Sequence, residues 1–350
     1  MRVAHINLQQ FDRANMRKLL VDFPLQFQHA RQIGASLNFE IDRTAIKNLL
    51  FAGMGGSAIG GDLIGSCLSD QLPVPAMVIR NYVLPAFVDR HSLVIVSSYS
   101  GNTEEALSCS EVARSRKATI VAIASGGKLA AWAQAHGVPL ISIPGGAPPR
   151  TALGYLTVPL LVWLANAGLV RLAEHDFEQT QQLLERNNRR YASDADDNPA
   201  LKLANQLRNK FPIIYCSADL LWPVAWRWKG QFSENSKVLA FCNVFPELNH
   251  NEIVGWQQLP ERLRDFQIIY LRDRDDHPRN QKRMEITRGI LERVCAPIIE
   301  LYAEGESRLA RLFSLVQLGD WVSYYLAVLS GIDPTPIEKI QHLKDQLSRE

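Results

Sequence analysis

One short region of the chain gathers ionisable side chains among apolar neighbours. Glu234 and Asn235 follow a tryptophan-rich helical pattern, and His250 lies in the run Pro-Glu-Leu-Asn-His-Asn-Glu that ends at Glu252. A carboxylate and an imidazole in one cleft can divide acid and base work between them. His250 and Glu252 also match the His-x-Glu half of a zinc deaminase signature, but no Pro-Cys-x-x-Cys follows. The pattern favours proton transfer over zinc chemistry, and the competing interpretation of His250 is a hydrogen-bonded, partly buried histidine.

A glycine-rich loop is the second chemical signal. The sequence from Gly53 to Asp62 is Gly-Met-Gly-Gly-Ser-Ala-Ile-Gly-Gly-Asp, after an apolar run that predicts a buried strand. A helical pattern begins near Asp62. Glycines let the backbone turn sharply and approach a ligand, and the amides at a helix N-terminus favour an anion. We therefore predict a phosphate site that includes Gly56 and the hydroxyl of Ser57.

Two other interpretations of this loop stay open. Gly53, Gly55 and Ala58 fit the dinucleotide-binding fingerprint, which wants an acidic residue roughly 20 positions on to hold a ribose. Here the next predicted strand, residues 76–79, ends in Arg80. A phosphorylated cofactor could tolerate that arginine, so this alternative is weakened. The remaining interpretation is a tight turn without a ligand.

A serine-rich loop follows a later strand. Ser98, Ser100 and Thr103 place three hydroxyls around a glycine, just before a predicted helix. Hydroxyl donors, free amides and a positive helix end are what a phosphate monoester needs. The alternative is helix capping alone, with Thr103 as the cap and Glu104 and Glu105 complementing the dipole. Capping needs one hydroxyl and not three, and the two acids must point away from a bound dianion.

A single arginine precedes the most apolar segment. A Pro/Gly-rich turn, residues 144–149, delivers Arg150 to the start of residues 151–170. The arginine is either a surface cap or a fixed cation in a cleft, and the sequence does not choose between them. The apolar segment is about long enough to span a bilayer, but it contains Pro159 and Asn166 and stands alone. We therefore expect a buried core helix and no membrane partner.

Alternating strands and helices must position these residues. Such alternation predicts an α/β fold with parallel sheets covered by helices on both faces. Strands are expected at residues 49–52, 76–79, 93–96, 119–124 and 139–143 in the first half, and at 212–216, 238–241, 267–271 and 297–301 in the second. We expect N-terminal helices over 1–45, a first domain over 46–184, a polar linker over 185–200, a second domain over 201–330 and a helical tail over 331–350.

Composition favours a small-molecule partner. The 350 residues are 47% hydrophobic, enough for two ordinary cores, and the 38 basic and 36 acidic residues are well mixed. The net charge of +2 leaves no strong field to hold a nucleic acid. Five widely spaced cysteines without a Cys-x-x-Cys pair predict buried thiols, and no secretory signal is visible. We expect a cytoplasmic protein, and a solvated loop at residues 272–276.

Four motifs together resemble one known family. They are the glycine loop, Ser-Tyr-Ser-Gly-Asn-Thr, Pro-Arg-Thr-Ala-Leu-Gly-Tyr and Glu-Leu-Asn-His-Asn-Glu. The chain, from about residue 11 to 347, resembles the bifunctional phosphoglucose/phosphomannose isomerases of the sugar isomerase (SIS) superfamily. The first two motifs occur across SIS domains, and the last two are more specific to this branch. The resemblance implies two tandem SIS domains, each a parallel-sheet αβα sandwich, and a homodimer whose active site is completed across the interface.

The resemblance also implies roles for individual residues. The sugar-phosphate cradle comprises Ser57, Ser98, Ser100 and Thr103. Arg150 is the cation beside the reacting carbons, Glu234 is the base that moves the proton, and His250 opens the sugar ring. Lys344 in the terminal helix aids ring opening, with Lys339 as the alternative. A threonine hydroxyl is associated with acceptance of both epimers, and Thr335 is the candidate.

The implied reaction is aldose–ketose isomerisation of a phosphorylated hexose. One carboxylate can take a proton from C2 and return it to C1 through an enediol, so no metal or redox cofactor is required. Two alternatives stay open at this point. A SIS-type regulatory protein that senses sugar phosphates would keep the cradle and dispense with the Glu/His pair. An oxidoreductase would bind a nicotinamide nucleotide at the glycine loop.

Overall fold

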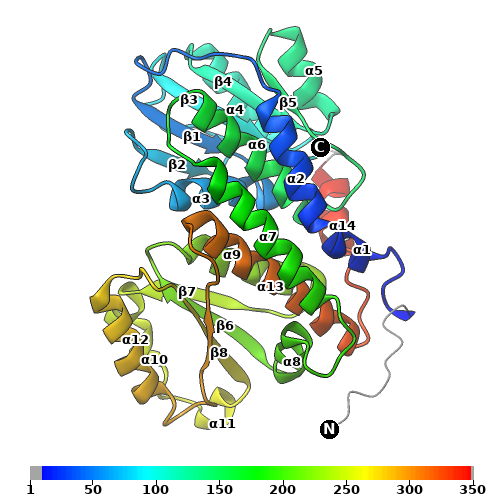
Figure 1. Cartoon of the computed structure of the whole chain (residues 1–350), viewed down its shortest axis with the longest axis vertical. Helices are drawn as coiled ribbons and strands as arrows, with labels where there is room; N and C mark the ends of the chain where they lie inside the picture. Colours follow the sequence, from blue (N-terminus) through cyan, green and yellow to red (C-terminus); the bar gives the residue numbers. More distant parts are fainter. Residues whose placement is uncertain (1–9, 348–350) are drawn as a thin grey trace.

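The computed structural model describes residues 10–347 and contains two parallel β-sheets with helices between and around them (Figure 1). The predicted α/β class is therefore confirmed. The first nine residues of the expected N-terminal helical segment, and the last three of the tail, lie outside the described range.

The first sheet has five strands in the order β2-β1-β3-β4-β5. Pairing is parallel throughout, with Leu50 beside Val94 in β1 and β3. Side chains alternate between faces along each strand, so Leu49 and Phe51 pack on one side of the sheet and Leu50 on the other. The strands are β1 (Asn48–Ala52), β2 (Ala76–Ile79), β3 (Ser92–Ser97), β4 (Thr119–Ala124) and β5 (Leu140–Ser142).

The second sheet has four parallel strands in the order β7-β6-β8-β9. They are β6 (Phe211–Ser217), β7 (Phe241–Phe245), β8 (Phe266–Arg272) and β9 (Ile299–Tyr302). The prediction of a strand at residues 238–241 was wrong, because β7 begins only at Phe241. Lys237 adopts a left-handed conformation, and the Val238 amide donates to the Phe232 carbonyl, so the chain is still leaving the preceding helix there.

The helices follow the strands in the order that parallel sheets require. Before and within the first half lie α1 (Met16–Val21), α2 (Phe23–Ala35), α3 (Gly55–Cys67), α4 (Glu104–Ser115), α5 (Gly127–Ala135), the 3₁₀ turn η2 (Pro149–Thr151) and α6 (Leu153–Asn166). The remainder are α7 (Glu174–Tyr191), α8 (Pro199–Gln206), α9 (Trp222–Gln231), the π-helical turn η3 (Phe232–Ser236), the 3₁₀ turn η4 (Glu247–His250), α10 (Glu252–Gly255), α11 (Pro260–Leu263), α12 (Pro278–Leu291), α13 (Arg308–Leu329) and α14 (Glu338–Leu347).

One hydrophobic core joins the two halves. Helices α2, α6, α7, α9 and α13 lie between the sheets, where α2 packs on α6 and α13 packs on α7 and α9 (Figure 1). Their side chains and the inner faces of both sheets form a continuous cluster. The polar segment 185–200 is partly helical, because α7 extends to Tyr191 and α8 begins at Pro199. The domain boundaries stay a prediction.

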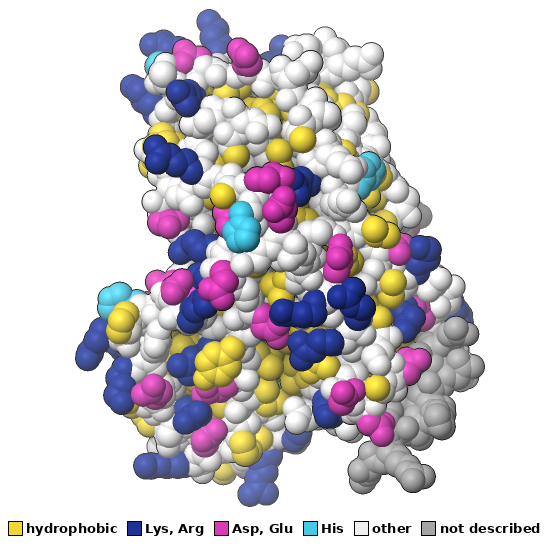
Figure 2. All heavy atoms as spheres, in the orientation of Figure 1, with side chains coloured by type: hydrophobic (Ala, Val, Ile, Leu, Met, Phe, Trp, Pro, Cys, Tyr) yellow, Lys and Arg dark blue, Asp and Glu magenta, His cyan; other side chains and the backbone are white. Residues whose placement is uncertain are grey.

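The most apolar helices belong to this core. Helix α13 is long and apolar enough to cross a membrane by length and composition, but all of its apolar window is buried inside the protein. Helix α6 is shorter and also buried, as predicted for the segment 151–170. On the face in Figure 2, acidic and basic side chains are interspersed and neither sign covers a large area.

Candidate active site

The glycine loop is the start of a helix. Helix α3 begins at Gly55, with Met54 before it in an extended conformation and no side chain capping its N-terminus. The predicted start near Asp62 was therefore wrong, since glycine's low helix propensity hides a helix that tertiary packing imposes. A Cβ on Gly56 would lie 3.1 Å from the Pro149 carbonyl oxygen, so glycine lets the N-terminus of α3 approach the turn that carries Arg150.

The serine loop is ordered by its own hydroxyls. The Ser98 and Thr103 hydroxyl oxygens are 2.8 Å apart, and the Ser100 hydroxyl accepts from the Asn102 amide at 3.2 Å. Thr103 occupies the N-cap position of α4, but its side chain makes no capping bond. The interpretation of Thr103 as a helix cap alone therefore fails.

Gly101 is required by the close approach of two loops. Its φ is +70°, and a Cβ there would lie 1.8 Å from the Gly126 carbonyl oxygen. Both the left-handed backbone and the missing side chain are needed. The Leu129 amide donates to the Gly101 carbonyl at 2.8 Å, so the serine loop also rests on the start of α5.

Tyr99 connects three of the predicted segments. Its amide donates to the Ser57 hydroxyl at 3.1 Å, and its own hydroxyl accepts from the Ala147 amide at 3.1 Å. The side chain is buried. Tyr99 therefore fixes the glycine loop, the serine loop and the Pro/Gly turn relative to one another at the carboxyl ends of β1 and β3.

Arg150 is a fixed, buried cation and not a surface cap. Its side chain is 3% exposed. The guanidinium donates from Nε to Asn235 Oδ1 at 2.6 Å, and from Nη2 to the Pro334 and Thr335 carbonyls at 2.9 Å each. Burial lowers the pKa of Arg150, and the carboxylate of Glu234 opposes that shift. Its side-chain partners come from two distant segments of the chain, Glu234 with Asn235 and Pro334 with Thr335.

Glu234 is presented by a change of helix type. Helix α9 widens into the π-helical turn η3, a feature that is frequent at functional sites. The turn aims Glu234 at Arg150, with Oε2 3.5 Å from Nη1. Lys237 ends the turn, and its ammonium donates to the Glu234 and Pro334 carbonyls. Burial, and then the charge of Arg150, lower the pKa of Lys237. Sequence analysis missed this lysine.

Arg150 and Glu234 line one cavity of about 230 Å³. Gly55 and Gly56 at the start of α3 also line it. The remaining lining residues are Ile59, Arg80, Trp226, Arg227, Lys229, Gly230, Gln231 and Ser233. The cavity thus places one carboxylate among several cations beside an uncapped helix N-terminus, which suits an anionic ligand that undergoes proton transfer.

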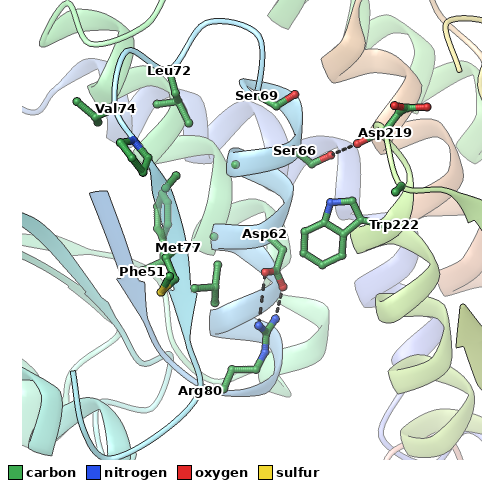
Figure 3. Close-up of a pocket in the computed structure, with 16 residues that line it drawn as sticks. Phe51, Asp62, Ser66, Ser69, Leu72, Val74, Met77, Arg80, Asp219 and Trp222 are labelled. Atoms are coloured by element: carbon green, nitrogen blue, oxygen red, sulfur yellow. Dashed lines mark hydrogen bonds and ion pairs between the residues drawn. The ribbon is translucent and has the colours of Figure 1, made fainter. Parts of the chain in front are cut away.

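A larger pocket of about 740 Å³ adjoins this cavity (Figure 3). It lies between β2, α3 and the loop after β6, and Arg80 lines both spaces. Arg80 forms an ion pair with Asp62 of α3. Burial raises the pKa of Asp62, and Arg80 opposes that shift. Arg80 is therefore already paired with a carboxylate on the helix.

Six predicted site residues do not line this cavity, namely the ring-opening candidates His250 and Lys344 and the cradle residues Ser57, Ser98, Ser100 and Thr103. His250 ends η4, and Lys344 lies on α14; both are exposed, and neither lines the cavity of Arg150 and Glu234. Lys339 is exposed on the same helix. Within residues 10–347, no group of three or more His, Cys, Asp or Glu side chains is arranged to hold a metal ion.

The loop at residues 272–276 is only partly solvated, since Arg274 and Asp275 are exposed but the other three residues are buried. Arg272, Asp273 and Asp276 are each less than 10% exposed. Arg311 of α13 donates to Asp273 at 2.8 Å and to Asp275 at 2.6 Å. The charged sequence suggested a surface loop because the arginine that neutralises it is distant in the chain.

Comparison with known proteins identifies the family. A model of the C-terminal SIS domain of bacterial phosphoglucose isomerase matches residues 196–347. A bifunctional phosphoglucose/phosphomannose isomerase from Caldicellulosiruptor bescii is 44% identical over 335 residues, which cover 95% of this chain and 99% of that relative. This chain belongs to the bifunctional phosphoglucose/phosphomannose isomerase family. Another bifunctional phosphoglucose/phosphomannose isomerase, from Aquifex aeolicus, is 38% identical over 309 residues, 88% of this chain and 92% of the relative.

A solved structure shares the fold of this chain. The crystal structure of a hypothetical protein from Thermus thermophilus superimposes with a TM-score of 0.72, covering 94% of this chain and 89% of the other at 17% identity. The resemblance drawn from the four motifs is confirmed. The segment that matches the SIS-domain model carries Glu234, His250 and Lys344.

Proposed function

We propose that this member of the bifunctional phosphoglucose/phosphomannose isomerase family interconverts glucose 6-phosphate and mannose 6-phosphate with fructose 6-phosphate. The observation that carries the proposal is the approach of Glu234 to Arg150 in a cavity beside the N-terminus of α3. The curated relatives named above support the same activity, and nothing favours the regulatory alternative. Five free cysteines support a cytoplasmic location.

Glu234 moves the proton in this proposal. Its carboxylate removes a proton from C2 of the open-chain aldose and returns it to C1, so that the reaction passes through a cis-enediol. The guanidinium of Arg150 stabilises the oxyanion that develops on the enediol. Arg150 can do this without reorganising, because Asn235 and two carbonyls already hold its guanidinium.

The phosphate group occupies the neighbouring loops. Ser57, Ser98, Ser100 and Thr103 surround it with hydroxyls, and Gly56 exposes backbone at the start of α3. Two uncapped helix N-termini, those of α3 and α4, contribute free amides and the positive ends of their dipoles. Tyr99 supports this assignment because its contacts hold the loops together.

Acceptance of both epimers needs room for rotation about the C2–C3 bond. The C1–C2 unit must turn so that Glu234 meets either face of C2. Thr335 is our candidate for providing that room. Its carbonyl accepts a hydrogen bond from Arg150, and its hydroxyl is buried without a partner in the described part of the chain.

The two residues proposed for ring opening are exposed in the single chain. We assign it to His250 and Lys344, in a homodimer whose active site is completed across the interface. Helix α14 supports association because Ile340, Leu343 and Leu347 are 40%, 58% and 45% exposed. A 10-residue helix is marginally stable alone, so these side chains favour a partner surface.

The activity is tested by supplying fructose 6-phosphate to chelator-treated protein in deuterated water. We expect deuterium at C2 of both glucose 6-phosphate and mannose 6-phosphate, followed by NMR. Formation of labelled glucose 6-phosphate alone over many turnovers would make this a single-substrate enzyme. No aldose at all would refute the isomerase proposal.

The shared active site is tested by complementation. Dimers mixed from the inactive Glu234→Gln and His250→Ala chains would each contain one intact site if Glu234 and His250 come from different subunits. We expect activity to return on mixing, with native mass spectrometry confirming mixed dimers. Mixed dimers without activity would place both residues of a site in one subunit.

A further inference from the structure

Arg227 ties the second half of the molecule to the backbone of Arg150. It lies on α9 and is 4% exposed. Its Nη2 donates to the Arg150 carbonyl oxygen at 2.8 Å. This bond joins residues 77 positions apart, one from each half of the chain. It fixes the main chain from which the Arg150 side chain projects.

The Arg150 carbonyl belongs to the 3₁₀ turn just before α6, which begins at Leu153. The Gly154 amide lies in the first turn of α6, where amides have no acceptor within the helix. That amide instead donates to Gln26 Oε1 at 2.8 Å, and the Gln26 amide group donates to the Thr151 carbonyl at 2.9 Å. Gln26 of α2 therefore binds the first turn of α6, and Arg227 of α9 binds the carbonyl of the turn just before it. The first hydrogen bond of α6 itself, from the Leu156 amide to the Ala152 carbonyl, is intact.

Asp320 of α13 holds Arg227 in place. Its carboxylate accepts from Arg227 Nε at 3.1 Å and Nη2 at 2.7 Å, and from Gln231 Nε2 at 2.8 Å. The carboxylate is buried, and burial raises the pKa of Asp320 while Arg227 opposes that shift. A buried pair of this kind holds only while both partners remain, because a lone buried charge is costly.

The same helix also holds the other end of Arg150. The Ser323 hydroxyl donates to the Asp320 carbonyl at 2.8 Å and accepts from Asn235 Nδ2 at 3.0 Å. Asn235 Oδ1 in turn accepts from Arg150 Nε. Helix α13 thus fixes the guanidinium through Asn235 and the backbone through Arg227.

We propose that Arg227 is a positioning residue that, through its bond to the Arg150 carbonyl, keeps the Arg150 guanidinium facing Glu234. The proposal rests on the isomerase function and adds to it a residue that acts through another. The geometric reason is that Arg150 projects from a short 3₁₀ turn, which has few hydrogen bonds of its own to resist movement. A displacement of about 1 Å at such a group can cost on the order of 100-fold in rate.

Arg227→Lys tests the proposal, with Arg311→Lys as the matched control. Arg311 forms an equally buried pair from α13, with Asp273 at 2.8 Å, but it does not line the cavity. We expect Arg227→Lys to lower kcat about 10- to 100-fold with KM for fructose 6-phosphate within about threefold. Arg311→Lys should lower Tm by a similar amount and leave kcat near wild type. Equal kcat values in the two variants would overturn the proposal.

A second readout does not depend on activity. The amides of Thr151 and Ala152 donate within the 3₁₀ turn at 2.9 and 3.2 Å. Their hydrogen–deuterium exchange should be faster in Arg227→Lys, by about tenfold or more, and unchanged in Arg311→Lys. Unchanged exchange in Arg227→Lys would overturn the positioning role. If the wild type turns over none of the hexose 6-phosphates, the isomerase proposal has failed, and the exchange result alone decides the role of Arg227.

Discussion

The two sheets have the same strand order but offer different chemistry at the carboxyl ends of their strands. Orders β2-β1-β3-β4 and β7-β6-β8-β9 correspond strand for strand, and ligands in such sheets bind beyond the carboxyl ends. In the first sheet those ends carry glycines and hydroxyls, and the helices that follow have no side-chain caps. Donor groups are left free for an anion.

In the second sheet, the polar groups at the carboxyl ends of the strands form hydrogen bonds with one another. Asp219 after β6 accepts from Ser217, Asn280 and the His277 amide. The His277 side chain caps α12, accepting from the Arg279 amide at 3.1 Å. The second half contributes to the site through α9 and its π-helical turn instead. One fold thus supplies anion binding in one sheet and a proton-transfer group beside the other.

Replacing Glu234, the proton-transfer residue in the second half of the chain, should have the largest effect on activity. Glu234→Gln keeps the shape of the side chain and removes its basicity, so we expect kcat to fall about 10²- to 10⁴-fold. Proton exchange at C2 should fall with it, while sugar-phosphate binding is largely retained. Isothermal titration and NMR exchange measure the two. Glu300→Gln, a carboxylate held on β9 by Arg288, is the control and should stay active. Proton exchange at C2 at the wild-type rate in Glu234→Gln would contradict the assignment of Glu234 as the base.

The next effect concerns the first sheet. Replacing Ser98, Ser100 and Thr103 together by alanine removes three donors to the phosphate. Charge-assisted hydrogen bonds contribute about 1.5 to 3 kcal/mol each before non-additivity, so binding should weaken by several kcal/mol. Titration with fructose 6-phosphate checks this.

The second sheet supplies the control for that triple variant. Ser217→Ala removes a hydroxyl at the carboxyl end of β6, and we expect unchanged affinity because its partner is Asp219. Unphosphorylated fructose should bind the triple variant and wild type alike. Equal affinity of both for fructose 6-phosphate would contradict a phosphate cradle in the serine loop.

A substitution at Gly101 tests how closely the serine loop packs against the neighbouring loop. Gly101→Ala forces a side chain into a left-handed position where Gly126 leaves no space. We expect a loss of about 2 to 5 kcal/mol in unfolding free energy, from conformation and overpacking together. Gly137→Ala has a similar φ of +64° but open surroundings, so about 1 to 2 kcal/mol is expected there. Urea unfolding measures both, and equal losses would mean that packing between the loops is unimportant.

The smallest expected effect is a change of stability with pH caused by Asp276, in the loop after β8. Burial, with smaller contributions from the charges of Asp273 and Asp219, raises the pKa of Asp276 to about 7. Between about pH 4 and 7 the folded state therefore holds more protons than the unfolded state, and this group's stabilisation is lost as pH rises. Relative to Asp276→Asn, the wild type should lose about 1 to 3 kcal/mol of stability from pH 4.5 to 7.5. Urea unfolding of both proteins at pH 4.5 and 7.5 measures this change. A stability difference between wild type and Asp276→Asn that does not change with pH would contradict the raised pKa of Asp276.

Local patterns were sufficient for much of the framework. Apolar runs predicted β1, β3 and β4, because buried parallel strands are nearly continuous in hydrophobic residues. The serine loop was likewise recognisable, since hydroxyls, a glycine and a helix start lie within a few residues. Failures occurred where local propensity was overridden. The start of α3 was predicted too late because its glycines have low helix propensity. The start of β7 was predicted too early because the π-helical turn before it does not follow the 3.6-residue period of an α-helix.

The sequence by itself determined which segments end in donor-rich loops and which residues resemble a sugar isomerase. Only the tertiary structure decided what Arg150 does. The sequence left surface cap and buried cation equally open, and contacts with Asn235, Thr335 and Glu234, each more than 80 residues away, made it a fixed cation. The same holds for residues 272–276, where Arg311 pairs with the buried Asp273. The reason is that burial and charge pairing depend on which distant side chains share a cavity, and local sequence determines only how each segment begins and ends.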